Sequence, residues 1–202
     1  NYNSSTVSVL LGNGNGTFAA KVDYGTGSSP YSVAVGDFNG DGKPDMAVAN
    51  FGSSTVSVLL GNGNSTFATK VDYGTGANPV FVAVGDLNGD GKPDIVTANY
   101  TSNTVSVLLG NGNGTFAARV DYGTGNLPFS VAVGDFNGDG KPDMAVANYG
   151  SATVSVLLGN GNGTFAARVD YGTGTSPVSV ALGDLNGDGK PDMAVANDGS
   201  NT

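Results

Sequence analysis

Hydrophobic and polar residues follow a repeating pattern along the chain, and residues 79–126 show one full copy of it. Residues 82–86 and 95–99 are short apolar runs of strand length. Residues 104–109 alternate apolar and polar side chains, as a half-buried strand does. No segment has a helical period. The pattern therefore predicts three short strands in succession.

A fourth strand is expected after the turn at residues 110–114, where Asn-Gly tolerates the positive φ that hairpin turns need. Alternation then places Phe116, Ala118, Val120 and Tyr122 on one face of that strand. Each copy of the pattern is thus predicted to form four antiparallel strands.

The pattern recurs every 49 residues, four times in all. Four antiparallel strands per repeat is the anatomy of a β-propeller blade, so we expect an all-β, β-propeller-type fold of four-stranded blades. A β-solenoid is the main competitor, but its coils are usually shorter and parallel. The expected boundaries within a single repeat domain, 1–202, are a half blade at 1–27, blades at 30–76, 79–125 and 128–174, and a half blade at 177–202.

The pattern stops in mid-unit at both ends. Residues 1–27 hold only the third and fourth strands of a unit, and residues 177–202 only the first and second, so one blade is expected to be split between the termini. Halves that meet within the chain would close a four-bladed ring. Halves that meet between chains would give a larger ring or an open, head-to-tail filament. These alternatives stay open at this point.

One polar segment follows the first expected strand of every unit. In the first copy, Asp37, Asn39, Asp41 and Asp45 place side-chain oxygens at positions 1, 3, 5 and 9, and the carbonyl of Lys43 adds position 7. Oxygen ligands at alternate positions of a glycine-containing loop suit a hard cation, and three carboxylates suit Ca²⁺ better than Mg²⁺. Asp, Asn and Gly also favour plain turns, but four intact copies favour about one Ca²⁺ per repeat. The expected ligands are Asp37, Asn39, Asp41, Lys43, Asp45, Asp86, Asn88, Asp90, Lys92, Asp94, Asp135, Asn137, Asp139, Lys141, Asp143, Asp184, Asn186, Asp188, Lys190 and Asp192.

Charge and composition argue against several classes of function. The net charge is −9, and four divalent cations would nearly neutralise it. Only eight basic residues are present, with no basic patch, so nucleic acid is not an expected partner. No apolar run reaches membrane-spanning length, so no membrane insertion is expected. Without histidine, cysteine or glutamate, acid–base chemistry would fall to Asp, Lys or Tyr, and the loops claim most aspartates. We therefore expect no enzymatic activity.

Two sequence runs resemble a known repeat. They are Ser-Val-Ala-Val-Gly-Asp-Phe-Asn-Gly-Asp-Gly-Lys-Pro-Asp-Met-Ala-Val-Ala-Asn and Val-Ser-Val-Leu-Leu-Gly-Asn-Gly-Asn-Gly-Thr-Phe. They resemble the FG-GAP/VCBS repeat of integrin α-subunit propellers and of many bacterial secreted proteins, over essentially the whole chain. The resemblance implies the blade fold and the calcium ligands in the four loops. The Phe-Gly and Gly-Ala-Pro signatures of the integrin form are replaced here, so integrin-like ligand binding does not carry over.

Two further features allow more than one interpretation. Sequons recur at Asn15, Asn64, Asn113 and Asn162, with others at Asn3 and Asn99, and they serve either as hairpin turns or as glycan acceptors. The aromatic residues Phe51, Tyr100 and Tyr149 follow the second strands. They either stack on sugar rings or pack between blades.

The sequence as a whole predicts a non-enzymatic, extracellular or cell-surface calcium-binding repeat module for adhesion or structural assembly. Its expected partners are copies of itself, joined head to tail into a fibre or larger ring, and glycans or cell-surface proteins. A carbohydrate-binding lectin propeller is the alternative function, and part of a polysaccharide-active enzyme is the third.

Overall fold

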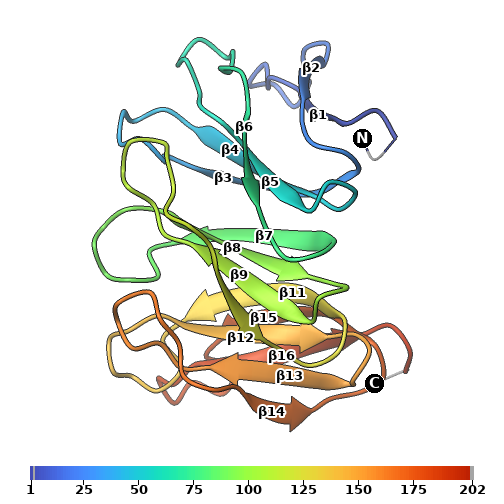
Figure 1. The fold of residues 1–202 in the computed structure, drawn as a ribbon, viewed down its shortest axis with the longest axis vertical. Coiled ribbons are helices and arrows are strands. Elements are labelled where there is room, and N and C mark those ends of the chain that lie inside the picture. Colours follow the sequence, from blue (N-terminus) through green and yellow to red (C-terminus); the bar gives the residue numbers. More distant parts are fainter. Residues whose placement is uncertain (2, 201–202) are drawn as a thin grey trace.

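A computed structural model describes residues 1 and 3–200 (Figure 1). The expected half blades at 1–27 and 177–202 include Tyr2, Asn201 and Thr202, which lie outside the described residues. The strands are β1 (Thr6–Val9), β2 (Val22–Gly25), β3 (Pro30–Gly36), β4 (Asp45–Asn50), β5 (Thr55–Leu59), β6 (Val71–Gly74), β7 (Pro79–Gly85), β8 (Asp94–Asn99), β9 (Thr104–Leu108), β10 (Val120–Gly123), β11 (Pro128–Gly134), β12 (Asp143–Asn148), β13 (Thr153–Leu157), β14 (Val169–Gly172), β15 (Pro177–Gly183) and β16 (Asp192–Asn197).

The strands form antiparallel sheets that follow the repeat. Three sheets have four strands each in sequence order, β3–β6, β7–β10 and β11–β14, and two have only two strands, β1–β2 and β15–β16. The described part of the chain contains no helix, and therefore none with the length and apolarity to cross a membrane. The predicted all-β fold of four-stranded antiparallel repeat units is confirmed.

The sheets follow one another in an open arc. The first strand of each unit packs beside the first strand of the next, β3 on β7, β7 on β11 and β11 on β15. Strands β1 and β2 lie at the top of Figure 1, far from β15 and β16 near the bottom. Among the described strands β1 pairs with β2 alone and β16 with β15 alone. The structure therefore does not show the closed four-bladed ring.

The core lies between successive sheets and consists of small and medium-sized side chains. Every residue of β4, β8 and β12 is buried. One cluster joins Phe38 and Val56 of one unit to Val82 and Ile95 of the next. Because each core layer contains side chains from two units, a unit buries its apolar faces only when a neighbour is stacked on it.

The third and fourth strands differ from the sequence prediction. The third strand was expected to be half-buried, but even its serine, Ser106 in β9, is fully buried. The fourth strand is short, because Phe116 forms only an isolated bridge with Gly110 and β10 begins at Val120. The predicted face of Phe116, Ala118, Val120 and Tyr122 is not uniformly buried, because Phe116 is 8% exposed whereas Val120 is 51% exposed.

The two large side chains of that segment instead contact neighbouring units. Tyr73 packs edge-on against Phe116 of the following unit with ring centroids 5.3 Å apart, and Tyr122 does the same with Phe165. Tyr73 and Tyr122 thus pack between units, whereas the equivalent Tyr171 in the last complete unit is 53% exposed.

Candidate metal centre

Each predicted calcium loop connects the first and second strands of a unit. The loop of the second unit leaves β7 after Gly85 and returns at Asp94, the first residue of β8. Gly89 and Gly91 adopt positive φ values of 76° and 79°, which lets the loop turn sharply twice within a few residues. The strand ends therefore hold positions 1 and 9 of the loop, and the glycines fold the positions between them inward.

The carboxylate at position 1 organises the loop. Asp86 Oδ1 accepts hydrogen bonds from the backbone N–H groups of Gly89 at 2.7 Å and Asp90 at 3.2 Å, and Oδ2 accepts one from Gly91 at 2.7 Å. Asn88 Oδ1 at position 3 accepts a second bond from the Asp90 N–H, at 2.9 Å. The oxygens at positions 1 and 3 are thus held on the inner side of the turn.

The carboxylate at position 5 is engaged by the lysine at position 7. Asp90 Oδ1 accepts the backbone N–H of Lys92 at 2.9 Å, and its Oδ2 lies 3.3 Å from the Lys92 ammonium. The backbone N–H of Lys92 is the main cause that lowers the pKa of Asp90. The same lysine ammonium contact recurs at Asp41, Asp139 and Asp188. In every loop the lysine ammonium at position 7 is therefore already paired with the position 5 carboxylate.

The carboxylate at position 9 of the second loop, Asp94, is fully buried and fastens the loop to the rest of its unit. Asp94 Oδ2 accepts the N–H of Leu87 at 2.8 Å, and Oδ1 accepts the N–H of Gly110 at 2.7 Å. Gly110 lies between the third and fourth strands of the same unit. Asp94 therefore connects the loop to that hairpin, a role that the ligand spacing alone did not indicate.

Burial disfavours the charged form of the Asp94 carboxylate and so raises its pKa. The neighbouring charges of Asp90 and Asp86 raise the pKa of Asp94 further. The hydrogen bonds that Asp94 accepts from the N–H groups of Gly110 and Leu87 lower its pKa, but the net shift is upward. A divalent cation in the loop would offset the repulsion among the three carboxylates.

The loops also touch the next unit. The backbone N–H of Gly114, in the β9–β10 hairpin, donates to the carbonyl of Phe38 at 2.9 Å. The Phe38 ring packs edge-on against Phe116, with centroids 5.5 Å apart. Anything that orders the Asp37–Asp45 loop therefore also orders a contact between units.

The twenty predicted ligand residues fall in four loops of closely similar geometry, because the bonds of Asp86 and Asn88 recur at Asp37 and Asn39, at Asp135 and Asn137, and at Asp184 and Asn186. Within residues 1 and 3–200, no three carboxylates already lie in metal-binding arrangement. The oxygen-only donor set and the uncompensated Asp94 fit a hard cation such as Ca²⁺. Its binding would draw Asp90 away from the Lys92 ammonium.

The sequons differ in accessibility. Asn15, Asn64, Asn113 and Asn162 are exposed, and each Oδ1 accepts the threonine hydroxyl two residues later at 2.6–2.7 Å. Asn99 is fully buried and donates to Thr104 and Ser106, so the folded chain cannot present it for glycosylation.

A family model of the FG-GAP-like repeat matches residues 1–48, 37–97, 86–146 and 135–195. Together these matches span almost the whole chain. No protein of curated function matches the sequence.

Several solved structures share the fold. A lectin of Agrocybe aegerita that recognises non-reducing terminal N-acetylglucosamine has a TM-score of 0.62 and 24% identity, covering 95% of this chain and 55% of its own. A protein of unknown function from Desulfotomaculum acetoxidans has a TM-score of 0.64 and 15% identity, covering 97% and 56%. The V. cholerae biofilm matrix protein Bap1 has a TM-score of 0.53 and 17% identity, covering 89% and 28%. The chain spans about half the length of the first two, and at these identities the likeness shows the fold alone.

Proposed function

The chain belongs to the FG-GAP-like repeat family, and from that premise we propose that it is a non-enzymatic, calcium-stabilised repeat module that serves adhesion or structural assembly outside the cell or at its surface. The observation that carries the proposal is the hydrogen bonding repeated in every loop, in which backbone N–H groups hold the side-chain oxygens at positions 1 and 3 inward. In the second loop these oxygens are accompanied by the buried carboxylate of Asp94, whose pKa is raised by burial and by the charges of Asp90 and Asp86.

In this proposal calcium acts as a clamp. An ion bound by Asp86, Asn88 and Asp90, with Asp94 and the Lys92 carbonyl, would tie the loop between two strands to the hairpin that Asp94 already reaches. Because Phe38 of the first loop contacts the next unit, the clamp also supports the stacking of units. Extracellular calcium-binding modules typically have dissociation constants of about 0.1–1 mM, so a location outside the cell predicts an affinity in that range for these loops.

Assembly is supported by β16. Its sequence, Asp-Met-Ala-Val-Ala-Asn, is identical to that of β4 and β12, whose residues are all buried, yet three of the six residues of β16 are exposed. Among the described residues no strand pairs with its outer edge, and such an edge accepts a further strand. Head-to-tail joining in this proposal pairs β16 with β1 of another copy, as β12 pairs with β13.

Thermal unfolding in calcium and in chelator tests the calcium clamp. A site that is saturated a hundredfold above its dissociation constant stabilises the fold by about 2.7 kcal/mol, so calcium should raise Tm by at least about 5–10 °C. Asp90→Ala, at an exposed position, should remove one binding site in a calorimetric titration and reduce the calcium-dependent rise in Tm. Magnesium should give a smaller rise.

Asp198→Ala is the matched control, because Asp198 is exposed and lies outside the loops. It removes the same charge and should leave the number of calcium sites unchanged. If Tm is the same in calcium and in chelator, and the titration gives no heat, the calcium clamp is wrong.

A further inference from the structure

Five aromatic side chains from three consecutive units gather at one place. Tyr31 lies 6.2 Å from Phe51 and 6.3 Å from Phe129 between ring centroids. Tyr100 lies 6.3 Å from Phe129 and 6.5 Å from Tyr149, and Phe129 and Tyr149 are 6.2 Å apart. Tyr31 and Phe129 occupy the same position in units two repeats apart, so the cluster spans the arc. We call these five residues the aromatic cluster.

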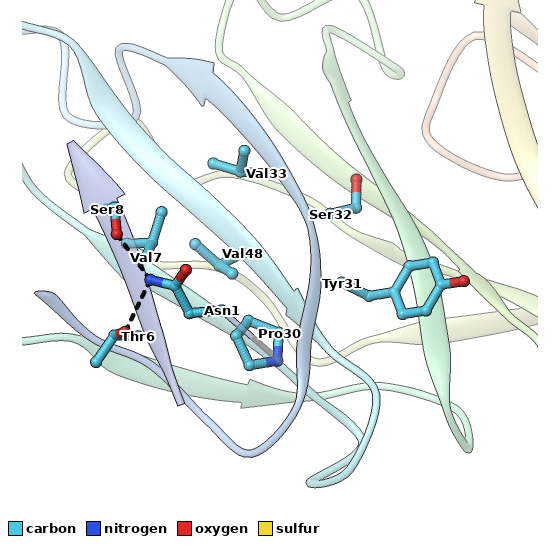
Figure 2. Close-up of a pocket in the computed structure, with 9 residues that line it drawn as sticks. All are labelled: Asn1, Thr6, Val7, Ser8, Pro30, Tyr31, Ser32, Val33 and Val48. Carbon is cyan, nitrogen blue, oxygen red and sulfur yellow. Dashed lines mark hydrogen bonds between the residues drawn. The ribbon is translucent and has the colours of Figure 1, made fainter. Parts of the chain in front are cut away.

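The cluster is accessible. Tyr31 is 51% exposed, and the other four rings are partly exposed. Tyr31 also lines a cavity of about 260 Å³ beside β1. In Figure 2 its ring points away from Asn1, Thr6 and Val7, which line the same cavity.

The cluster combines apolar faces with polar groups that have no partner. Among the residues that the structure describes, the hydroxyls of Tyr31, Tyr100 and Tyr149 make no hydrogen bond, unlike those of Tyr24 and Tyr122. The turns at 51–54, 100–103 and 149–152, where three of the rings lie, contain serine, threonine, asparagine, glycine and alanine but no charged residue. The surface is thus aromatic, rich in hydroxyl groups and uncharged.

The turns beneath the rings are held in place. Asn78 Nδ2 donates to the Phe51 carbonyl at 2.9 Å, and Asn103 Oδ1 accepts the Leu127 N–H at 2.8 Å, so neighbouring units are bonded across the turns. Leu127 and Ala152 have positive φ values of 54° and 52°, and the equivalent residues Ser29, Asn78 and Ser54 do too, so this conformation belongs to the repeat. The hydrogen bonds between units hold the turns that carry the rings, and a surface fixed in advance lowers the ordering cost of binding a ligand.

We propose that the aromatic cluster is a binding site for neutral saccharides. The C–H faces of a pyranose ring are apolar and suit aromatic rings, while its hydroxyls both donate and accept, which suits tyrosine hydroxyls and the serine and asparagine of the turns. Acidic saccharides are disfavoured, because the site has no cation and the chain carries a net charge of −9.

This inference goes beyond the calcium clamp and does not depend on it. The cluster lies at the start of the first strands, where Tyr31 is the second residue of β3, whereas the Asp37–Asp45 loop follows the end of the same strand. A saccharide on the cluster would touch no predicted calcium ligand. Failure of saccharide binding would therefore leave the calcium clamp intact, and the reverse also holds.

Tyrosine fluorescence tests the proposal directly, because the chain has eight tyrosines and no tryptophan. The full chain in calcium is titrated with cellotetraose, maltotetraose and chitotetraose as neutral probes and tetragalacturonate as the acidic one, up to about 10 mM. We expect a saturable change with at least one neutral probe. Tyr100→Phe and Tyr149→Phe, which keep the ring, should each weaken binding about three- to tenfold, the effect of one lost hydrogen bond.

Tyr171→Phe is the matched control, because Tyr171 is 53% exposed on β14 and lies outside the aromatic cluster. It should leave the affinity unchanged, and all three variants should melt as the parent does. The proposal is overturned if no neutral probe gives a saturable change, if Tyr171→Phe weakens binding as much as the cluster variants, or if tetragalacturonate binds more tightly.

Discussion

At the scale of single residues, a glycine outside the predicted calcium loops leaves no room for a side chain beside one of them. Gly110 donates its N–H to Asp94, and a Cβ on Gly110 would overlap the carbonyl oxygen of Pro93. The ligand spacing predicted Asp94 as a calcium ligand, but its bond to Gly110 joins residues sixteen apart in the chain. Only the folded hairpin brings these two groups together.

Gly110→Ala should therefore destabilise the fold by about 2–4 kcal/mol, because the methyl group displaces Pro93 and breaks the buried bond of Asp94. Gly12 occupies the same position in the first unit, where an added Cβ would meet only the Phe18 ring at 3.9 Å. Gly12→Ala is thus the matched control and should change the free energy of unfolding by less than about 0.5 kcal/mol. Urea unfolding of both variants measures the difference, and equal effects would contradict this account of Gly110.

At the scale of elements, the third strand of each unit is a polar junction inside the core. Ser106 Oγ in β9 donates to Asp121 on β10 at 2.6 Å and accepts from Asn99 on β8 at 2.8 Å and from the Gly76 N–H at 2.9 Å. The alternating pattern predicted a polar face turned to solvent. The face is buried instead, because the preceding unit covers it and supplies the Gly76 N–H.

Ser106→Ala should leave the Gly76 N–H without an acceptor in the core and the Asn99 amide with Thr104 as its one remaining acceptor, costing about 2–4 kcal/mol of stability. Ser8 in β1 is the equivalent residue, only partly buried, and it bonds Asn1 and Asp23. Ser8→Ala should cost about 1 kcal/mol or less, since solvent can replace the lost bonds. A comparable loss for both variants in chemical unfolding would mean that burial does not decide the strength of this junction.

At the scale of the whole molecule, the open arc leaves strand edges at both ends. In the complete units Asn50 Nδ2 donates to Thr55 and Ser57, and at the first unit Asn1 Nδ2 donates to Thr6 and Ser8 in the same way. A joined blade would place Asn197 of β16 opposite Thr6 of another copy, as Asn148 lies opposite Thr153. The side chain of Asn1 would then have to move away from Thr6 and Ser8, because Asn197 of the other copy would take its position.

Sedimentation in calcium should then show a mean mass that rises above 20.0 kDa with protein concentration. Ala194→Lys, at an exposed position of β16, should keep the chain monomeric, because a lysine on a strand edge opposes pairing. Ala166→Lys, at an exposed alanine away from β16, should assemble as the parent does. A parent chain that remains at 20.0 kDa at every concentration would disprove head-to-tail joining.

The sequence by itself determined the features that repeat locally. Strand type, the 49-residue unit and the spacing of oxygen side chains such as Asp86, Asn88 and Asp90 depend on residues close together in the chain, so their periods are visible without a structure. Only the tertiary structure decided which faces are buried and which distant residues meet. Ser106 is buried, Asp94 reaches Gly110, and Tyr31 meets Phe129 because whole units stack on one another, and stacking is a property of neighbouring units that no single stretch of sequence contains.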